Sequence, residues 1–569
     1  MKTWIGRASS VLLISILAWP LAGRASKQAG AGPSPTEHTV RKNPPADRAA
    51  DTHYQHGVAA LNKRDFQTAI REFRLAVKYA PQSARAHNSL GWTYLEVGQV
   101  DKAITELRKA TALSPDFALA HRHLGDALQR QGDLDGAIKS YQEALRLQPD
   151  WAEVHETLGI VLGHRGNFMG ARSEFEAAVK LTPDSATAHF HLGATYWFLG
   201  DSQSAISQLR TALDLKPDYG EARYYLGLAY QEQGKPDLAL EEFQSAAKLS
   251  PHSAEIHNAL GMALQHDGYM ADAAAEFQQA VKLEPKFSDA HNNLGLVYLG
   301  QGDGDGALRE FQAALDASPQ NHSARNNLGL TYLQKAQWED AIRTLRELIR
   351  LDPTNAEAHY NLGVALKQKE DFDAAIGALR QAIEIQPDLP EAHYTLGVIL
   401  WQQGKLDEAA AEFRAALRPK PDYERAHYIL GSVLRQKGDL EGALQELRTA
   451  VELDPKDAGA HQALGTVLRQ KRDLQGAAEE FRQAEALNKA LMNTQAATLA
   501  TNAGVKQLRQ GDCEGAINQF NNALKLAPDY AAAHYQLALA LQQKGDLEQA
   551  RAEFDKAQQL DPHLKAPRK

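Results

Sequence analysis

Apolar and polar residues repeat along this chain with a period of 34 residues, and each period has the pattern of two amphipathic helices joined by a turn. When the first repeat starts at Ala50, positions 3, 4, 7, 8 and 11 form one stripe at helical spacing, and positions 20, 24, 27 and 28 form a second. A proline at position 32, first seen as Pro81, ends the second helix because it lacks a backbone donor. The pattern predicts an all-α chain of about fifteen tandem helix–turn–helix repeats.

Small residues recur at fixed positions of the repeat. Position 20 is alanine in all fifteen repeats, position 8 is glycine in fourteen, and position 27 is alanine in fourteen. These residues allow the two helices to approach to the short end of the usual separation of about 8–10 Å, while leucine at position 7 and an aromatic residue or leucine at position 24 fill the remaining space. Asp or Asn at position 16, as in Asp133 and Asp201, is a favoured N-cap for the second helix. We expect each repeat to be stable only when stacked on its neighbours.

The period of 34 residues breaks once, near the C-terminal end. Thirteen repeats occupy residues 50–491, five extra residues occupy 492–496, two further repeats occupy 497–564, and a tail follows at 565–569. Lys489 replaces the terminating proline among good helix formers, so the second helix of the thirteenth repeat should continue past its usual end. We expect the insert 492–496 to be a hinge or to mark a second docking surface.

The N-terminal residues have a different character. In residues 1–25, Lys2 and Arg7 precede an apolar run, and small residues up to Ala25 offer a cleavage site, which is typical of a secretory signal peptide. Residues 26–49 contain four prolines and almost no large apolar side chains, which predicts a disordered linker. We therefore expect an exported protein, secreted or in a bacterial periplasm, with no membrane span after signal cleavage. An uncleaved N-terminal anchor is the alternative.

Glycine at position 8, alanine at positions 20 and 27 and proline at position 32 on this period resemble the tetratricopeptide repeat. The sequence Asn-Leu-Gly in several repeats is similar to the repeat arm of the protein O-linked N-acetylglucosamine transferases. The resemblance implies a right-handed superhelix whose first helices line a concave groove that binds peptides or proteins. The residues outside the repeats are too few for the sugar-transfer domain, so the resemblance implies no transferase activity here.

In this family, positions 2, 5, 9, 12 and 13 of the first helix face the groove, with position 6 beside them. Consecutive asparagines at position 6 resemble the asparagine ladder of the transferase arm, and an amide can both donate to and accept from a peptide backbone. Aromatic residues at such positions are typical binding hot spots. Solvated polar residues, and aromatic residues that pack between repeats, are the alternative interpretations. The implied peptide-binding groove comprises Asn292, Asn293, Asn326, Asn327, Asn361, Trp197, Tyr360, Tyr394, Trp401 and Tyr428.

Residues suited to catalysis or metal binding are few. Histidine stands at position 4 in twelve repeats, where the family commonly has tryptophan. Equivalent atoms of neighbouring repeats should lie about 10 Å apart, too far to share a metal ion whose bonds to nitrogen are about 2 Å. We therefore predict a hydrogen-bonded packing column, with a pH sensor as the alternative, and no metal site. The single cysteine, Cys513, has no partner that suggests a nucleophile. We expect no catalytic residues, no cofactor and no enzymatic activity.

The formal net charge of −9, from 62 basic and 71 acidic residues, disfavours a nucleic-acid partner. These features together predict a non-enzymatic scaffold or adaptor that holds protein or peptide partners. Two alternatives stay open: a docking component of an envelope secretion, pilus or polysaccharide complex, and a regulatory or substrate-recruiting subunit of a separately encoded enzyme such as a glycosyltransferase. The sequence specifies neither the partner nor the oligomeric state.

Overall fold

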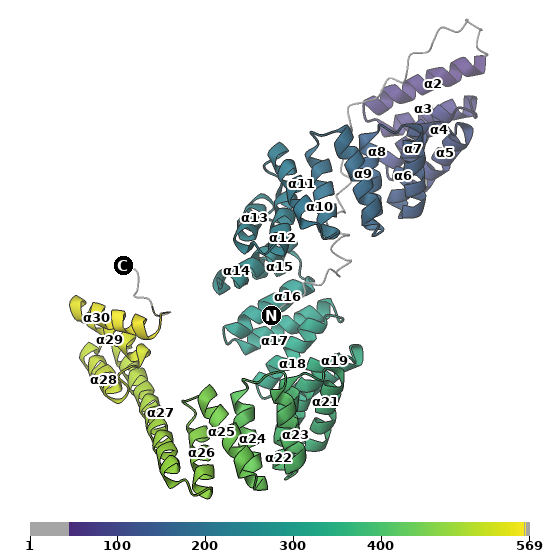
Figure 1. Ribbon diagram of the computed structural model, residues 1–569. Coiled ribbons are helices and arrows are strands. Elements are labelled where there is room, and N and C mark those ends of the chain that lie inside the picture. Colours follow the sequence, from purple (N-terminus) through teal and green to yellow (C-terminus); the bar gives the residue numbers. More distant parts are fainter. Residues whose placement is uncertain (1–44, 563, 565–569) are drawn as a thin grey trace. The chain divides into compact units, whose positions relative to one another are not determined.

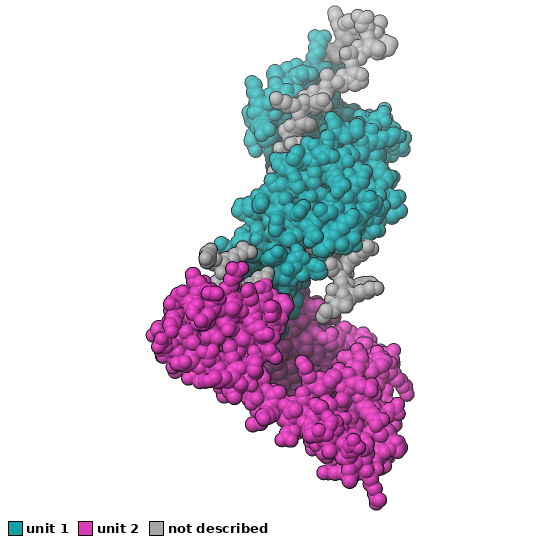
Figure 2. All heavy atoms as spheres, turned by 60° about the vertical axis from the view of Figure 1, so that its left-hand side comes forward, with its two compact units in different colours: residues 1–301 teal, residues 302–569 magenta. Residues whose placement is uncertain are grey.

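The computed structural model describes residues 45–562 and 564. These residues form 29 helices and no strand, and the helices follow one another as tandem helix–turn–helix pairs (Figure 1). The described part of the chain thus confirms the predicted all-α solenoid of repeats. The chain divides into two compact units, Met1–Gln301 and Gly302–Lys569, which Figure 2 shows in different colours. The predicted signal peptide, most of the predicted linker and the tail at 565–569 lie outside the described residues.

Each unit is a succession of helices of similar length. Unit 1 contains α2 (Pro45–Asn62), α3 (Phe66–Tyr79), α4 (Ala84–Glu96), α5 (Val100–Leu113), α6 (Ala118–Gln131), α7 (Leu134–Leu147), α8 (Ala152–His164), α9 (Phe168–Leu181), α10 (Ala186–Phe198), α11 (Ser202–Leu215), α12 (Gly220–Glu232), α13 (Pro236–Leu249), α14 (Ala254–His266), α15 (Met270–Leu283) and α16 (Ser288–Gly300). Unit 2 contains α17 (Gly304–Ala317), α18 (His322–Gln334), α19 (Trp338–Leu351), α20 (Ala356–Gln368), α21 (Phe372–Ile385), α22 (Pro390–Gln402), α23 (Leu406–Leu417), α24 (Glu424–Lys437), α25 (Leu440–Leu453), α26 (Ala458–Gln470), α27 (Leu474–Arg509), α28 (Cys513–Leu526), α29 (Ala531–Lys544) and α30 (Leu547–Leu560).

The first helix starts earlier than the sequence pattern indicated. Helix α2 begins at Pro45, so the linker predicted for residues 26–49 is wrong for its last five residues. Proline is well tolerated in the first turn of a helix, where its missing N–H has no partner to lose. Asp47 then places a negative charge in the first turn, where the helix dipole favours it.

Helix α27 is 36 residues long and joins the second helix of the thirteenth repeat to the first helix of the fourteenth. It confirms that the helix continues past Lys489. It also places the insert 492–496 inside a continuous helix, so the hinge predicted there is not a break in secondary structure. The sequence of α27 contains no proline and is rich in alanine, which keeps the backbone hydrogen bonds of the helix intact.

Glycine at position 8 is required by the side chain at position 24 of the same repeat. A Cβ atom on Gly125 would lie 2.6 Å from a ring carbon of Tyr141, and one on Gly261 would lie 2.6 Å from a ring carbon of Phe277. Both rings are fully buried. The predicted N-caps are also confirmed in ten repeats, as where Asp133 Oδ1 accepts a hydrogen bond from the Gly136 N–H at 2.9 Å. The two helices of a repeat therefore pack closely, as predicted from the small residues at positions 8, 20 and 27.

Position 15, in the turn between the two helices, adopts the left-handed backbone conformation in all fifteen repeats. Eleven repeats have glycine there, which the sequence analysis did not single out. Four repeats place a residue with a side chain in this conformation: Arg64, Ala336, Glu370 and Arg472. Such a residue costs roughly 1–2 kcal/mol in this region of backbone space.

Replacing Ala336 with glycine should therefore stabilise the ninth repeat by up to about 1 kcal/mol, because φ is +57° and the side chain is exposed. Native-state hydrogen exchange of α18 and α19 would measure the gain. Gly438→Ala, at the same position of the twelfth repeat with φ of +83°, should destabilise α24 and α25. If both substitutions have no effect, strain at position 15 contributes nothing to stability.

Histidine at position 4 connects two hydrogen-bond acceptors that belong to different parts of the fold. His393 Nδ1 lies 2.6 Å from Glu412 Oε2 of the same repeat, and Nε2 lies 2.9 Å from the carbonyl oxygen of Pro387, in the turn before α22. A neutral imidazole can donate only one hydrogen bond, so both bonds require the protonated ring. The hydrogen bond to Glu412 raises the pKa of His393, and the equivalent bond to Glu446 raises that of His427.

The same pair of contacts recurs along the chain, which confirms the predicted hydrogen-bonded column. Arginine replaces this histidine in the sixth repeat, and Arg223 donates to Glu242 at 2.9 Å and to the Pro217 carbonyl at 3.2 Å. A permanent cation thus makes the same two contacts in the sixth repeat. The histidines that contact both a glutamate and the preceding proline carbonyl are His87, His155, His257, His393, His427, His461 and His534.

Candidate functional site

Within each unit the first helices of consecutive repeats form a layer, in which several neighbouring pairs contact one another directly. In unit 1, α4 contacts α6 and α10 contacts α12. In unit 2, α18, α20 and α22 contact one another in turn, and so do α24 and α26. Each second helix packs mainly between the first helix of its own repeat and that of the next. We call the face of this layer that points away from the second helices the first-helix surface, and the groove residues predicted from the sequence all belong to first helices.

The predicted asparagines are engaged between neighbouring repeats. In unit 1, Asn293 Nδ2 donates to Asn258 Oδ1 at 3.0 Å. In unit 2, Asn361 Nδ2 lies 3.5 Å from Asn326 Oδ1, and Asn326 Nδ2 donates to Glu357 Oε1 at 3.2 Å. The Asn293–Asn258 and Asn361–Asn326 contacts join position 6 of one repeat to position 5 of the preceding one, a spacing of 35 residues, whereas the bond from Asn326 to Glu357 spans 31 residues.

The asparagines also differ in how accessible they are. Asn361 and Asn292 are buried, with 5% and 9% of their surface exposed. Asn293, Asn326 and Asn327 are half-buried, and the Asn327 carbonyl accepts a hydrogen bond from the Thr331 hydroxyl on α18. The asparagine ladder therefore stays a prediction, with part of the bonding capacity of the Asn293, Asn326 and Asn361 side-chain amides used inside the protein.

Three predicted aromatic residues form a row at position 5 of α20, α22 and α24. Tyr360, Tyr394 and Tyr428 are half-buried and pack against one hydrophobic core cluster. The Tyr394 ring makes an edge contact with Phe413, with ring centres 5.8 Å apart, and a tilted contact with Tyr423 at 5.1 Å. Trp401, at position 12 of α22, donates from Nε1 to Gln436 Oε1 of α24 at 2.9 Å. Each aromatic residue is thus held on one side by its neighbours.

Trp197 belongs to a separate aromatic cluster in unit 1. Its ring makes edge contacts with Phe198 and Tyr225, with ring centres 4.8 and 5.5 Å apart. The indole Nε1 is buried and has no hydrogen-bond partner among the described residues. Close by, Phe190 and His191 line a small apolar cavity together with Phe175. These contacts fit Trp197 as a residue that packs between repeats better than as an exposed binding hot spot.

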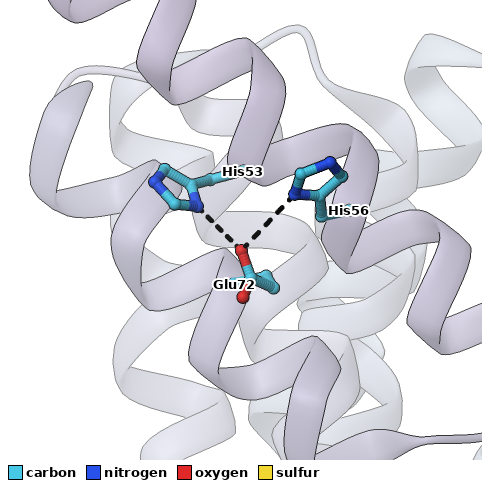
Figure 3. A group of neighbouring side chains, drawn as sticks. All are labelled: His53, His56 and Glu72. Carbon is cyan, nitrogen blue, oxygen red and sulfur yellow. Dashed lines mark hydrogen bonds and ion pairs between the residues drawn. The ribbon is translucent and has the colours of Figure 1, made fainter.

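The first repeat contains a cluster that the sequence analysis missed. His53 and His56 on α2 both point toward Glu72 on α3, as Figure 3 shows. His53 Nδ1 lies 2.7 Å from Glu72 Oε2, and His56 Nδ1 lies 3.9 Å from the same oxygen. The distance between repeats argues against a metal ion shared along the histidine column, whereas this cluster forms inside one repeat. The signal was His56, which replaces the leucine found at position 7 of thirteen repeats.

A second feature missed from the sequence lies in the middle of α27. The side chains of Leu491, Met492 and Leu499 are 58%, 69% and 71% exposed. In a regular repeat, the chain turns here and the next helix covers such residues. Because α27 runs on without a turn, its central apolar side chains stay in solvent. None of the helices in the described ranges is long and apolar enough to cross a membrane.

Most of the repeats match descriptions of known protein families. The chain matches the tetratricopeptide repeat family over residues 54–107, 90–150, 157–206, 192–254, 226–282 and 501–564, which together span half of its length. A second tetratricopeptide repeat description matches residues 270–302, and the C-terminal domain of cilia and flagella-associated protein 70 matches residues 287–501. No curated protein matches the chain.

Solved structures with similar folds include three repeat proteins. A MamA chain from Desulfovibrio magneticus RS-1 that runs from residue 41 to its end is 28% identical, with 29% of this chain and 94% of that chain covered and a TM-score of 0.28. YrrB, described as a TPR protein with an unusual peptide-binding site, is 24% identical over 33% of this chain and 97% of its own, with a TM-score of 0.28. Yeast Tom70 is 17% identical over 75% of this chain and 97% of its own, with a TM-score of 0.33.

Proposed function

The chain belongs to the tetratricopeptide repeat family, and we propose that it is a non-enzymatic scaffold that binds an extended peptide segment of a partner protein on the first-helix surface of unit 2. One observation carries the proposal: the row of tyrosines at position 5 of three consecutive first helices, α20, α22 and α24. A row of equivalent side chains on stacked repeats suits a ligand that is itself extended along the stack.

Half-buried tyrosines are well suited to this role. Tyr360, Tyr394 and Tyr428 each pack on the core of unit 2 but keep part of the ring in solvent. A ring that is already held loses little rotamer freedom when a partner covers its remaining surface. The hydroxyl gives the same side chain a polar end that can bond to a peptide backbone.

Asparagine extends the row at its N-terminal end. Asn326 occupies position 5 of α18, the first helix before α20, and its side chain is half-buried. Its amide donates to Glu357 and accepts from Asn361, which leaves one donor and one acceptor site for a ligand. Peptide backbones present donors and acceptors in alternation, so an amide that can supply both is an appropriate partner.

The proposal can be tested with peptides selected by the full chain from a random peptide library. Tyr428→Ala and Trp401→Ala should each weaken binding of the selected peptides by at least about tenfold, as expected for aromatic hot spots. Fluorescence anisotropy would give the dissociation constants, and circular dichroism would confirm that each variant is folded.

Arg380→Ala is the matched control, because this side chain is 63% exposed on α21, a second helix of the same region. Its affinity should equal that of the wild-type chain. Peptides that bind Tyr428→Ala and Trp401→Ala as tightly as the wild-type chain would contradict a binding surface on these helices.

A further inference from the structure

The first repeat differs from all others at the place where the histidine column begins. In later repeats the position 4 histidine is anchored by the proline carbonyl of the preceding turn. His87, for example, contacts Pro81 and is only 4% exposed. Among the described residues, no repeat precedes α2, and His53 makes no such contact with a proline carbonyl. The His53 side chain is instead 26% exposed, so its ring is accessible from solvent.

The residue at position 7 adds a second imidazole beside this accessible ring. His56 follows His53 by three residues on α2, a spacing that puts both side chains on one face of the helix. Thirteen other repeats have leucine here, which is buried against the second helix. The His56 side chain is 65% exposed, so its imidazole does not fill the place of that leucine in the core.

The three side chains have the spacing that a small metal ion requires. One nitrogen from each histidine and one oxygen of Glu72 all lie within 4.8 Å of one another. The separations from Glu72 Oε2 are 2.7 Å to His53 Nδ1 and 3.9 Å to His56 Nδ1. Ligands bound to zinc at about 2.0–2.2 Å in a tetrahedron are roughly 3.3 Å apart, so small side-chain rotations would place all three correctly.

The carboxylate is in a suitable state to act as a ligand. A glutamate carboxyl group has an ordinary pKa of about 4.3, and Arg71 Nε donates to Glu72 Oε1 at 3.3 Å. Glu72 is therefore ionised at neutral pH. Two neutral imidazoles and one carboxylate are the ligands that zinc takes in open, three-residue sites, whereas calcium and magnesium prefer oxygen ligands throughout.

We propose that the first repeat binds one first-row divalent transition-metal ion, zinc in the first instance, through His53, His56 and Glu72, with water completing the coordination. On binding, the proton that His53 Nδ1 shares with Glu72 leaves that nitrogen and Nε2 carries a proton instead, exchanged through solvent, so that Nδ1 and the carboxylate are both free to bind the metal. The ion then holds α2 against α3 in the first repeat. The site goes beyond the proposed scaffold function and does not depend on it.

Isothermal titration of the untagged full chain with zinc alone, after treatment with a chelator, tests the proposal. One zinc ion should bind per chain, and His56→Leu should lower the affinity by at least about tenfold. Leucine is the residue that other repeats carry at this position, so the variant keeps a packed first repeat, which a thermal unfolding curve in the absence of metal would verify. Cobalt should bind at the same site and give the visible absorption of a tetrahedral complex.

His252→Gln is the matched control, because it removes another exposed histidine that lies outside the cluster. It should bind zinc like the wild-type chain. The proposal is wrong if the wild-type chain binds no zinc. It is equally wrong if His56→Leu binds zinc as tightly as the wild-type chain.

Discussion

Replacing Gly363 with alanine should lower the stability of the tenth repeat by about 1–2 kcal/mol. The added Cβ atom would lie 2.6 Å from Leu379 Cγ and 2.8 Å from Leu379 Cδ2, far inside van der Waals contact. Leu379 is fully buried, so it cannot rotate away without displacing its neighbours in α20 and α21. The clash outweighs the gain of about 0.5–1 kcal/mol that alanine normally brings to a helix interior over glycine.

Gly377 provides the matched control within the same repeat. It lies inside α21, and a Cβ atom there would meet no other atom within 4 Å. Gly377→Ala should therefore stabilise the repeat by about 0.5–1 kcal/mol. Hydrogen exchange of α20 and α21 in both variants would show opposite shifts. Stabilisation in both would mean that the two helices separate easily and that the glycine column reflects no packing requirement.

This contrast shows how much of the fold the sequence predicts. A glycine at position 8 and a large side chain at position 24, sixteen residues later, suffice to predict a close helix pair, and Gly363 with Leu379 confirms it. The caps at position 16 and the continuation past Lys489 were predicted by equally local rules. The start of α2 was harder to predict from the sequence, because a proline such as Pro45 is compatible both with a linker and with the first turn of a helix.

The candidate site was less predictable because its contacts depend on how the repeats stack. The bond from Asn293 to Asn258 joins residues 35 apart, and no rule for a single repeat contains that contact. Whether Asn361 is buried or exposed likewise depends on the neighbouring first helix. His56 was visible in the sequence as an exception at position 7. Its proximity to Glu72 became clear only once α2 and α3 were placed together.

Histidines at positions 4 and 6 should respond to pH in opposite directions. At position 4, the hydrogen bond to Glu446 raises the pKa of His427, so the folded protein favours the charged ring. At position 6, burial lowers the pKa of His191 to about 4 and that of His123 to about 3, so the folded protein favours the neutral ring. The ordinary pKa of 6.5 applies in the unfolded chain.

The sign of each effect follows from which state binds the proton. Below pH 6.5 the unfolded chain protonates His191 while the folded protein does not, so the free energy of unfolding decreases as the pH falls toward 4. His427 has the opposite shift. The stability that it contributes is fully present below pH 6.5 and is lost as the pH rises through its higher folded pKa. The fifth repeat should therefore weaken as the pH falls below 6.5, and the twelfth should weaken as the pH rises above 6.5.

Of His191 and His427, His191 gives the clearer test of pH-dependent stability because of its surroundings. Its ring stacks on Phe175 at 5.3 Å, and its Nδ1 is buried without a hydrogen-bond partner in the described residues. Glu156 Oε1 lies 3.6 Å from Nε2, and burial raises the pKa of that carboxyl group. A phenylalanine in place of His191 would keep the stacking on Phe175 and remove the titrating group.

His191→Phe should therefore lose much less stability than the wild-type chain when the pH falls from 7 to 5. Between pH 7 and pH 4, the free energy of unfolding of the wild-type chain should fall by about 3 kcal/mol more than that of the variant. Hydrogen exchange of α10 at a series of pH values would measure it. His427→Phe, the contrasting variant, should keep the acid sensitivity of α10 and weaken α24 near pH 6 instead. If the wild-type chain and His191→Phe weaken equally between pH 7 and 5, the folded protein accepts a proton on His191, with Glu156 as the counter-charge.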